Sequence, residues 1–158
     1  MGEIRVDIKL ENAVDHSMFR KNKITAEKVR SHTMGAVVDT GAVMLALPID
    51  VVKKLDLDEQ RNAVVTYAND TRETLLICGP VYIELAGRSM NTECIVLPPT
   101  VEALIGQVVL ETLDLIPDCQ NQTLGPRPES PIYPMLNLKK TISIIHLSRI
   151  KLSFPMLL

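Results

Sequence analysis

One carboxylate in this chain occupies a position that is costly for an acid unless the acid has a task. Asp39 follows the apolar run of residues 36–38 and directly precedes Thr40 and Gly41. Buried or half-buried carboxylates are rare unless they are paired or hydrogen-bonded. The position therefore predicts either an acid that takes part in chemistry or an Asp that caps a turn by binding local backbone amides.

A second segment favours the chemical interpretation. Asp-Thr-Gly alone is weak, because the tripeptide occurs by chance in roughly 3% of chains of this length. However, the segment Ala103-Leu104-Ile105-Gly106 follows downstream, with Gly106 lying 65 residues after Gly41. The chain contains one Asp-Thr-Gly. Any reaction that requires two such carboxylates would therefore need a second copy of the chain.

The elements that position these residues are predicted to be mostly strands. Alternating and β-branched apolar runs, separated by turn residues, are typical of a small β-barrel or sandwich. Residues 11–34 are predicted as a solvated loop with a short strand, and Gly79-Pro80 is expected to end a hairpin that turns at residues 68–71. The expected strands are residues 4–10, 35–39, 45–47, 63–67, 73–77, 81–85, 92–97 and 104–105, with short helices at 49–55 and 107–115.

Composition limits the class of protein. The chain has 158 residues, 46% apolar side chains, 3% aromatic side chains and no Trp, so one domain with an aliphatic core is expected. A net charge of −2 provides no basic surface for nucleic acid. Three cysteines without C-x-x-C spacing argue against a disulfide framework or a zinc site, and the scattered histidines suggest no metal centre. Cys78 and Cys94 are predicted to be small buried side chains.

The ends of the chain carry weaker signals. The first residues lack the apolar segment of a signal peptide, so the cytoplasm is the expected location. Residues 141–158 are apolar but include His146, Arg149 and Lys151, which argues against a membrane span. A strand-like extension is the simpler interpretation of this tail, and a peripheral membrane contact is the alternative.

In their order and spacing, these features resemble the retropepsin-like (clan AA) aspartic proteases, especially the short single-domain forms of bacteria and retroelements. The resemblance spans roughly residues 4–118 and rests on residues 37–42, the hairpin at 67–74 and the segment 103–106. It implies an all-β fold, namely a small closed β-barrel of the acid protease type with one or two short helices, forming half of a two-fold dimer. The implied division is a protease domain at 1–123, a Pro-rich extended connector at 124–140 and an apolar C-terminal tail at 141–158.

The resemblance also implies a reaction. In this family two carboxylates share one proton, and together they activate water and protonate the carbonyl of a peptide bond. With one Asp39 per chain, the active site would form at a homodimer interface. The implied catalytic residues are Asp39, Thr40 and Gly41. The Thr40 hydroxyl would bond across the dimer axis, and Gly41 would allow close backbone approach.

The implied substrate is an extended, mainly apolar polypeptide segment, hydrolysed without a cofactor or metal. Candidate substrate contacts are Ala42, Tyr67, Ala68 and Asn69, the last three in a hairpin that would close as a flap. This flap tip is polar and has no glycine, and Gln107 replaces a charged residue that ties the retroviral dimer together. These departures favour the alternative of a non-catalytic dimerisation or peptide-binding module on the same fold. A further alternative is a poorly folded fragment with an accidental tail.

Overall fold

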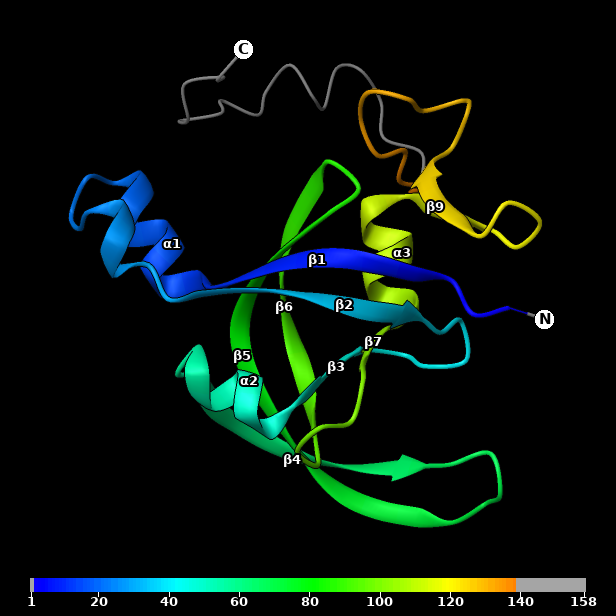
Figure 1. Cartoon of the computed structure of the whole chain (residues 1–158), viewed down its shortest axis with the longest axis horizontal. Coiled ribbons are helices and arrows are strands. Elements are labelled where there is room, and N and C mark those ends of the chain that lie inside the picture. The colour runs from blue at the N-terminus through cyan, green and yellow to red at the C-terminus, as the bar shows by residue number, and fades with distance from the viewer. Residues whose placement is uncertain (1, 139–158) are drawn as a thin grey trace.

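The computed structural model describes residues 2–138 of the chain, and Figure 1 shows its mostly β architecture. In chain order the elements are β1 (Arg5–Asn12), α1 (Ala13–Arg20), the 3-10 turn η1 (Ala26–Lys28), β2 (Ser31–Val38), β3 (Leu45–Pro48), α2 (Ile49–Lys54), β4 (Asp58–Thr66), β5 (Arg72–Leu85), β6 (Arg88–Leu97), β7 (Ala103–Ile105), α3 (Gln107–Leu113), β8 (Leu115–Asp118) and β9 (Thr123–Pro126).

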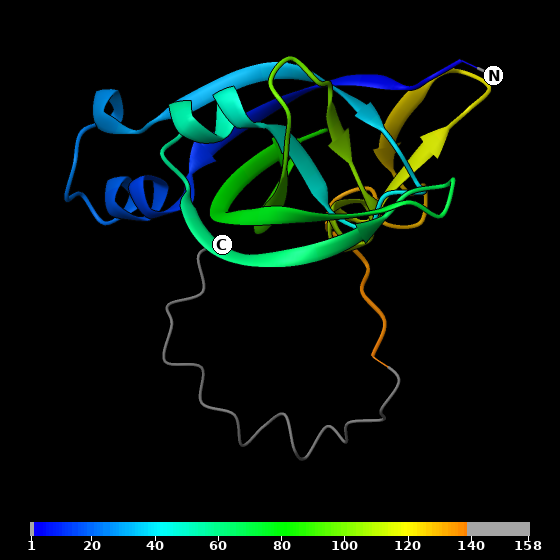
Figure 2. The same ribbon diagram turned by 90° about the horizontal axis from the view of Figure 1, so that it is seen from below.

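The main sheet closes into a six-stranded barrel. Its hydrogen-bonded order is β1-β2-β7-β3-β6-β5, and the second half of β5 pairs back onto β1. The first half of β5 instead pairs with β4, which lies outside the ring. Figure 2 shows the strands arranged around the barrel interior. Closure removes free strand edges, and it confirms the predicted all-β fold with a small closed barrel.

The barrel interior is aliphatic, as the composition predicted. In β1, Ile8 and Leu10 are buried whereas Lys9 between them is exposed, which is the alternation expected of a half-buried strand. Burial of each such Ile or Leu side chain contributes ~1.5–3 kcal/mol. Cys78 and Cys94 are buried free thiols that face each other across β5 and β6, which confirms their prediction as small core residues.

The prediction that Gly79-Pro80 ends a strand is wrong. Strand β5 runs without interruption from Arg72 to Leu85. Its register with β6 shifts between Cys78 and Val81, so the segment that contains Pro80 bulges from the ladder. A proline lacks the N–H that a regular ladder needs, but a bulge tolerates it.

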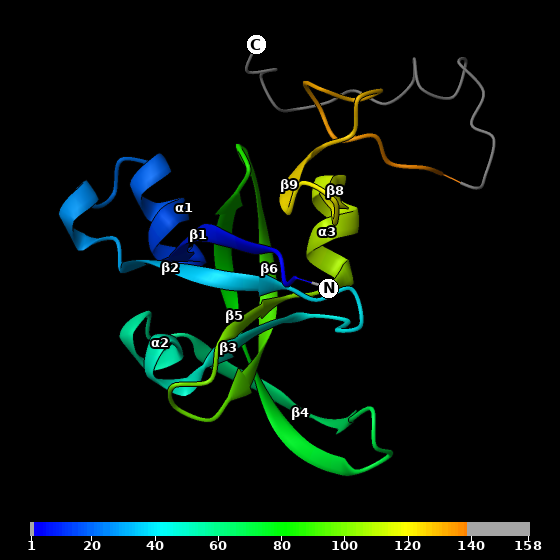
Figure 3. The ribbon, with the colours of Figure 1, turned by 45° about the vertical axis from the view of Figure 1, so that its right-hand side comes forward.

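Residues 11–34 also differ from the prediction, because they contain helix α1 and the start of β2 rather than mainly loop. The Asn12 side-chain oxygen accepts hydrogen bonds from the backbone amides of Val14 and Asp15, which caps the helix. The Asn12 amide nitrogen donates to the Leu55 carbonyl at 2.9 Å and so ties this cap to the end of α2. Figure 3 shows α1 and α2 toward one end of the barrel and α3 toward the other.

The chain after α3 continues to contact the barrel domain. Strands β8 and β9 form a second, two-stranded sheet, and β9 crosses the predicted boundary at residue 123. Ser130, beyond that boundary, is buried. The division into a domain and a connector stays a prediction. The predicted tail at 141–158 lies outside the described residues, and within those residues no helix has the length and apolar character needed to cross a membrane.

Candidate active site

The Asp39 backbone continues the pairing of two parallel strands. In the register of β2 and β7, Val38 lies opposite Ile105. The Asp39 amide then donates to the Ile105 carbonyl at 3.0 Å, one step beyond the end of β2. The main chain of Asp39 is therefore fixed by the barrel, while its side chain is half-buried at the barrel surface.

The turn after Asp39 is closed by its own backbone. The Ala42 amide donates to the Asp39 carbonyl at 3.1 Å. The Gly41 amide donates to Oδ1 of the Asp39 carboxylate at 2.9 Å, and a Cβ at position 41 would lie only 3.2 Å from that oxygen. Among the described residues, Gly41 gives this carboxylate its one hydrogen bond, so most of its acceptor capacity is free.

The second motif packs against this turn, as the resemblance implied. A Cβ on Gly106 would lie 2.6 Å from the Met44 carbonyl oxygen and 2.7 Å from that of Ala42, so only glycine fits. The first amides of α3 then bind the same loop, with Gln107 donating to the Ala42 carbonyl at 2.8 Å and Val108 to the Val43 carbonyl at 2.9 Å. The loop thus satisfies amides that a helix start leaves without partners.

The side chain of Gln107 has a role that the sequence did not reveal. Its Nε2 donates to the carbonyl of Thr40 at 2.8 Å. We interpreted this glutamine from the sequence as the replacement of a charged dimer residue, but here it holds the Asp-Thr-Gly turn of its own chain. The only signal in the sequence was its place directly after Gly106.

The outer face of the turn is open in the single chain. Thr40 and Gly41 are exposed. Beside them Val43 is 63% exposed and Val108 is 39% exposed, and the two are joined by the backbone hydrogen bond described above. Two exposed apolar side chains therefore lie beside the candidate catalytic residues.

The remaining candidate residues lie apart from this turn. Tyr67, Ala68 and Asn69 are exposed at the tip of the β4–β5 hairpin, which projects at the same end of the barrel as the loop after β2 (Figure 1). The Tyr67 hydroxyl donates to the Glu73 carboxylate at 2.8 Å, and this hydrogen bond raises the pKa of Tyr67. The Asn69 side chain accepts the amide and hydroxyl of Thr71. Within residues 2–138, no hydrogen bond joins the hairpin tip to the Asp39 turn.

Comparison with protein families identifies the family of this chain. The family model described as "Aspartyl protease" matches residues 25–109, which is more than half of the chain. The chain belongs to the retropepsin-like aspartyl proteases. The matched region contains the Asp39 turn, the hairpin tip and Gly106, whereas α1 lies outside it. The predicted family is therefore confirmed. A comparison with curated proteins found no match.

The candidate site presents a carboxylate, a hydroxyl and backbone groups. Within residues 2–138, no three His, Cys, Asp or Glu side chains lie close enough together to hold a metal ion. The polar groups of the turn are the Asp39 carboxylate, the Thr40 hydroxyl and backbone amides. These groups can hold a water molecule by hydrogen bonds, and the Asp39 carboxylate can exchange a proton with it.

Proposed function

We propose that this chain is an aspartic endopeptidase that hydrolyses peptide bonds in extended, mainly apolar polypeptide segments. The observation that carries the proposal is the placement of Asp39. Its backbone amide donates a hydrogen bond of 3.0 Å to the Ile105 carbonyl. Its half-buried carboxylate accepts a hydrogen bond of 2.9 Å from the Gly41 amide and from no other described residue. A rigidly placed acid with free lone pairs suits proton transfer to and from water.

The active site would form where two copies of the chain meet. Each chain contributes one Asp39, and a two-fold interface brings identical surfaces together. The exposed Thr40 and the apolar surface of Val43 and Val108 support this arrangement, because a dimer would bury them. In it, the two Thr40 hydroxyls bond across the axis and the Asp39 carboxylates approach each other.

The proposed reaction uses the two carboxylates as one unit. Like charges held close together cannot both ionise, so the pair shares one proton. The ionised Asp39 takes a proton from water as that water attacks the peptide carbonyl carbon, and the protonated Asp39 gives its proton to the carbonyl oxygen. The pair then gives a proton to the amide nitrogen, the C–N bond of the tetrahedral diol breaks, and one hydroxyl of the diol returns a proton to the pair as the acid and amine products form.

The β4–β5 hairpin would cover the substrate. Its tip residues Tyr67, Ala68 and Asn69 close over an extended peptide and exclude water. Ala42 contacts the peptide on the side opposite the hairpin. The polypeptide is the proposed partner, because the net charge of −2 does not favour nucleic acid. The cytoplasm is the proposed location.

Peptide cleavage tests this function directly. The purified chain is incubated with a mixed peptide library from mildly acidic to neutral pH, beside Asp39→Asn, and products are read by mass spectrometry. We expect cleavage at apolar sites by the wild type and none by the variant. Light scattering on the same samples should show a dimer for both proteins.

The other outcomes separate the alternatives. A folded, dimeric wild type that cleaves nothing would contradict the proposal and support the non-catalytic dimerisation or peptide-binding module. Cleavage that survives Asp39→Asn would exclude Asp39 as the catalytic acid. Cleavage by a monomer would contradict the shared site while leaving peptidase activity intact.

A further inference from the structure

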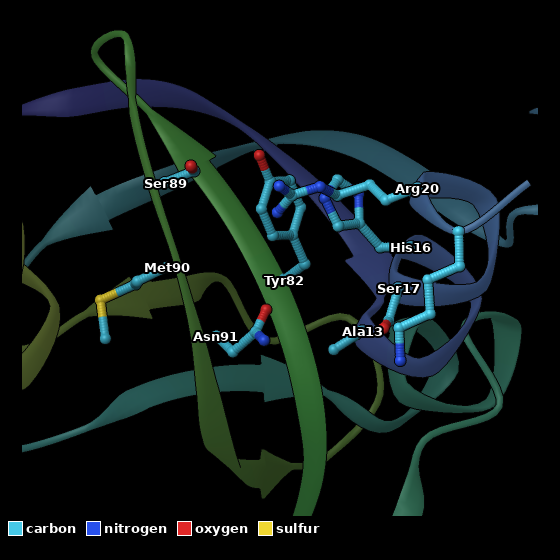
Figure 4. A pocket seen from close by; sticks show the side chains of 9 residues that line it. Ala13, His16, Ser17, Arg20, Tyr82, Ser89, Met90 and Asn91 are labelled. Carbon is cyan, nitrogen blue, oxygen red and sulfur yellow. The ribbon is translucent and has the colours of Figure 1, made fainter. Parts of the chain in front are cut away.

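A cleft lies between α1 and the β5–β6 hairpin, at the opposite end of β2 from Asp39. Its volume is about 470 Å³, within the range of roughly 300–1,000 Å³ typical of small-molecule sites. Helix α1 and its end contribute His16, Ser17, Arg20 and Lys21, and the hairpin contributes Tyr82 and Asn91. Figure 4 shows the side chains of His16 and Arg20 extending from α1 toward the side of the cleft formed by Tyr82.

The cleft is basic, although the chain as a whole is acidic. Arg20 and Lys21 line it, no acidic residue does, and the net charge of the chain is −2. Within residues 2–138, no carboxylate lies within ion-pair distance of Arg20 or Lys21. Two cations that share a concave surface raise the local concentration of anions.

The acids nearest to the cleft are already engaged. Glu11 accepts a hydrogen bond from Nδ1 of His16 at 2.6 Å and forms an ion pair with Lys9 at 3.2 Å. The hydrogen bond that Lys9 donates to Glu11 raises the pKa of Lys9, and the charge of Glu84, which lies opposite Lys9 in the pairing of β1 with β5, adds a smaller contribution. The charges of Arg20 and Lys21 are thus left for a ligand.

The lining of the cleft includes a stacked pair of aromatic rings, here called the aromatic floor. The rings of His16 and Tyr82 are stacked, with centroids 3.8 Å apart and planes 13° from parallel. The bond from His16 to Glu11 fixes the orientation of this pair, and Tyr82 lies opposite Asn91 in the strand register. A stacked aromatic pair offers a surface on which a further planar ring packs well.

The cleft is distinct from the peptidase site. Helix α1 ends at Arg20, before the family match begins at residue 25. The helix and its C-cap residue Lys21, which together supply both cations, are therefore features of this chain outside the region matched to the family. Any ligand bound there would contact neither the Asp39 turn nor the tip of the β4–β5 hairpin.

We propose that this cleft binds a small molecule that carries an anionic head group, either phosphate or carboxylate, on a planar ring. The head group accepts hydrogen bonds from the guanidinium of Arg20, which suits both anions, and from the ammonium group of Lys21. The ring packs against His16 and Tyr82. The Asn91 amide, which neighbours Tyr82 on the hairpin, provides a polar contact for substituents of the ring.

A titration of the full chain followed by NMR tests this site without requiring peptidase activity. The probes are phenyl phosphate, benzoate, inorganic phosphate and benzyl alcohol, each up to about 10 mM, a range in which weak ligands are detected. We expect phenyl phosphate or benzoate to shift backbone amides in α1 and around residues 82 and 91. Comparison of these two shows which head group is preferred. Benzyl alcohol and inorganic phosphate should bind about tenfold more weakly, because each lacks one half of the ligand.

A matched pair of variants assigns the binding to the two cations. The double variant Arg20→Gln with Lys21→Gln should weaken binding by about tenfold or more. The control, Lys28→Gln with Lys53→Gln, removes the same charge from exposed positions elsewhere and should change the affinity by less than about twofold.

Three results would overturn the inference. The first is the absence of amide shifts with both ring-bearing anions. The second is an equal loss of affinity in the two double variants, which would show a response to overall charge only. The third is equal affinity for inorganic phosphate and phenyl phosphate, which would exclude a role for the aromatic floor.

Discussion

Two aspartates of this chain, Asp39 and Asp114, each directly follow a secondary-structure element, β2 and α3 respectively, and yet their carboxylates have opposite surroundings. Asp114 ends helix α3 and is 3% exposed. Its carboxylate accepts hydrogen bonds from the Ser130 hydroxyl, the Met135 amide at 2.9 Å and the Arg127 guanidinium. These bonds, led by the one from Ser130, hold the pKa of Asp114 at about 2, below its ordinary value of 3.8.

The carboxylate of Asp39 contrasts with this arrangement. It is half-buried rather than buried, and Gly41 supplies its one hydrogen bond among the described residues. A carboxylate can accept about four hydrogen bonds. Asp114 uses this capacity to attach residues 127–135 to the end of α3, whereas Asp39 retains it. The filled acceptors of Asp114 therefore stabilise the fold, whereas the open acceptors of Asp39 are available for the proposed reaction.

The comparison predicts opposite effects of the same substitution. Asp39→Asn should reduce peptide cleavage by about a thousandfold or more and leave the melting temperature unchanged, because no buried network depends on its charge. Asp114→Asn should lower the melting temperature by several degrees and retain cleavage. Initial rates and thermal unfolding of both variants provide the test. The comparison breaks if Asp39→Asn destabilises the fold as much as Asp114→Asn does.

A substitution that moves the Asp39 turn should have the next largest effect. Gly106→Ala places a Cβ 2.6 Å from the Met44 carbonyl oxygen, so the loop must shift. Displacement of a catalytic group by about 1 Å can cost about a hundredfold in rate. The control is Gly35→Ala, whose Cβ would meet no heavy atom within 4 Å. Equal activity of the two variants in a cleavage assay would show that the contact does not position Asp39.

Removal of the Gln107 side chain should have a smaller effect. Gln107→Ala loses the 2.8 Å hydrogen bond to the Thr40 carbonyl, and we expect about a tenfold decrease in kcat with little change in KM. Gln120→Ala removes an exposed glutamine side chain far along the chain and serves as the control. A dimer that dissociates in Gln107→Ala would instead show that this side chain contributes to the dimer interface.

The smallest expected effect is a pH dependence of stability. Because folding lowers the pKa of Asp114 from 3.8 to about 2, its ionised form stabilises the fold fully above pH 3.8. That contribution is lost as the pH falls through about 2. The gap in melting temperature between the wild type and Asp114→Asn should therefore shrink over this range. A constant gap would show that the charge of Asp114 is not what stabilises the fold.

The sequence predicted most strands and both segments of the candidate site. Its failures share a physical cause, since they involve contacts that no local pattern encodes. Helix α1 was missed because its stability depends on the Asn12 cap and on the tie from Asn12 to Leu55. The end predicted at Pro80 was wrong because a register shift against β6 accommodates the proline. Strands β8 and β9 were missed because each of these short segments pairs only with the other.

The sequence by itself determined the kind of chain this is. Alternating apolar runs rich in β-branched residues specified strands, and the scarcity of aromatic residues specified an aliphatic core. The tripeptide Asp39-Thr40-Gly41 after an apolar run specified an acid on a turn. Such signals are local, because side-chain period and turn chemistry act over a few residues.

Only the tertiary structure decided how distant residues meet. Parallel pairing of β2 with β7 brings Ile105 to the Asp39 amide, and the loop that follows Asp39 packs on Gly106. The fold likewise sets His16 of α1 on Tyr82 of β5 and so forms the basic cleft. These contacts join residues that lie more than sixty positions apart, so they depend on closure of the whole barrel rather than on any local preference.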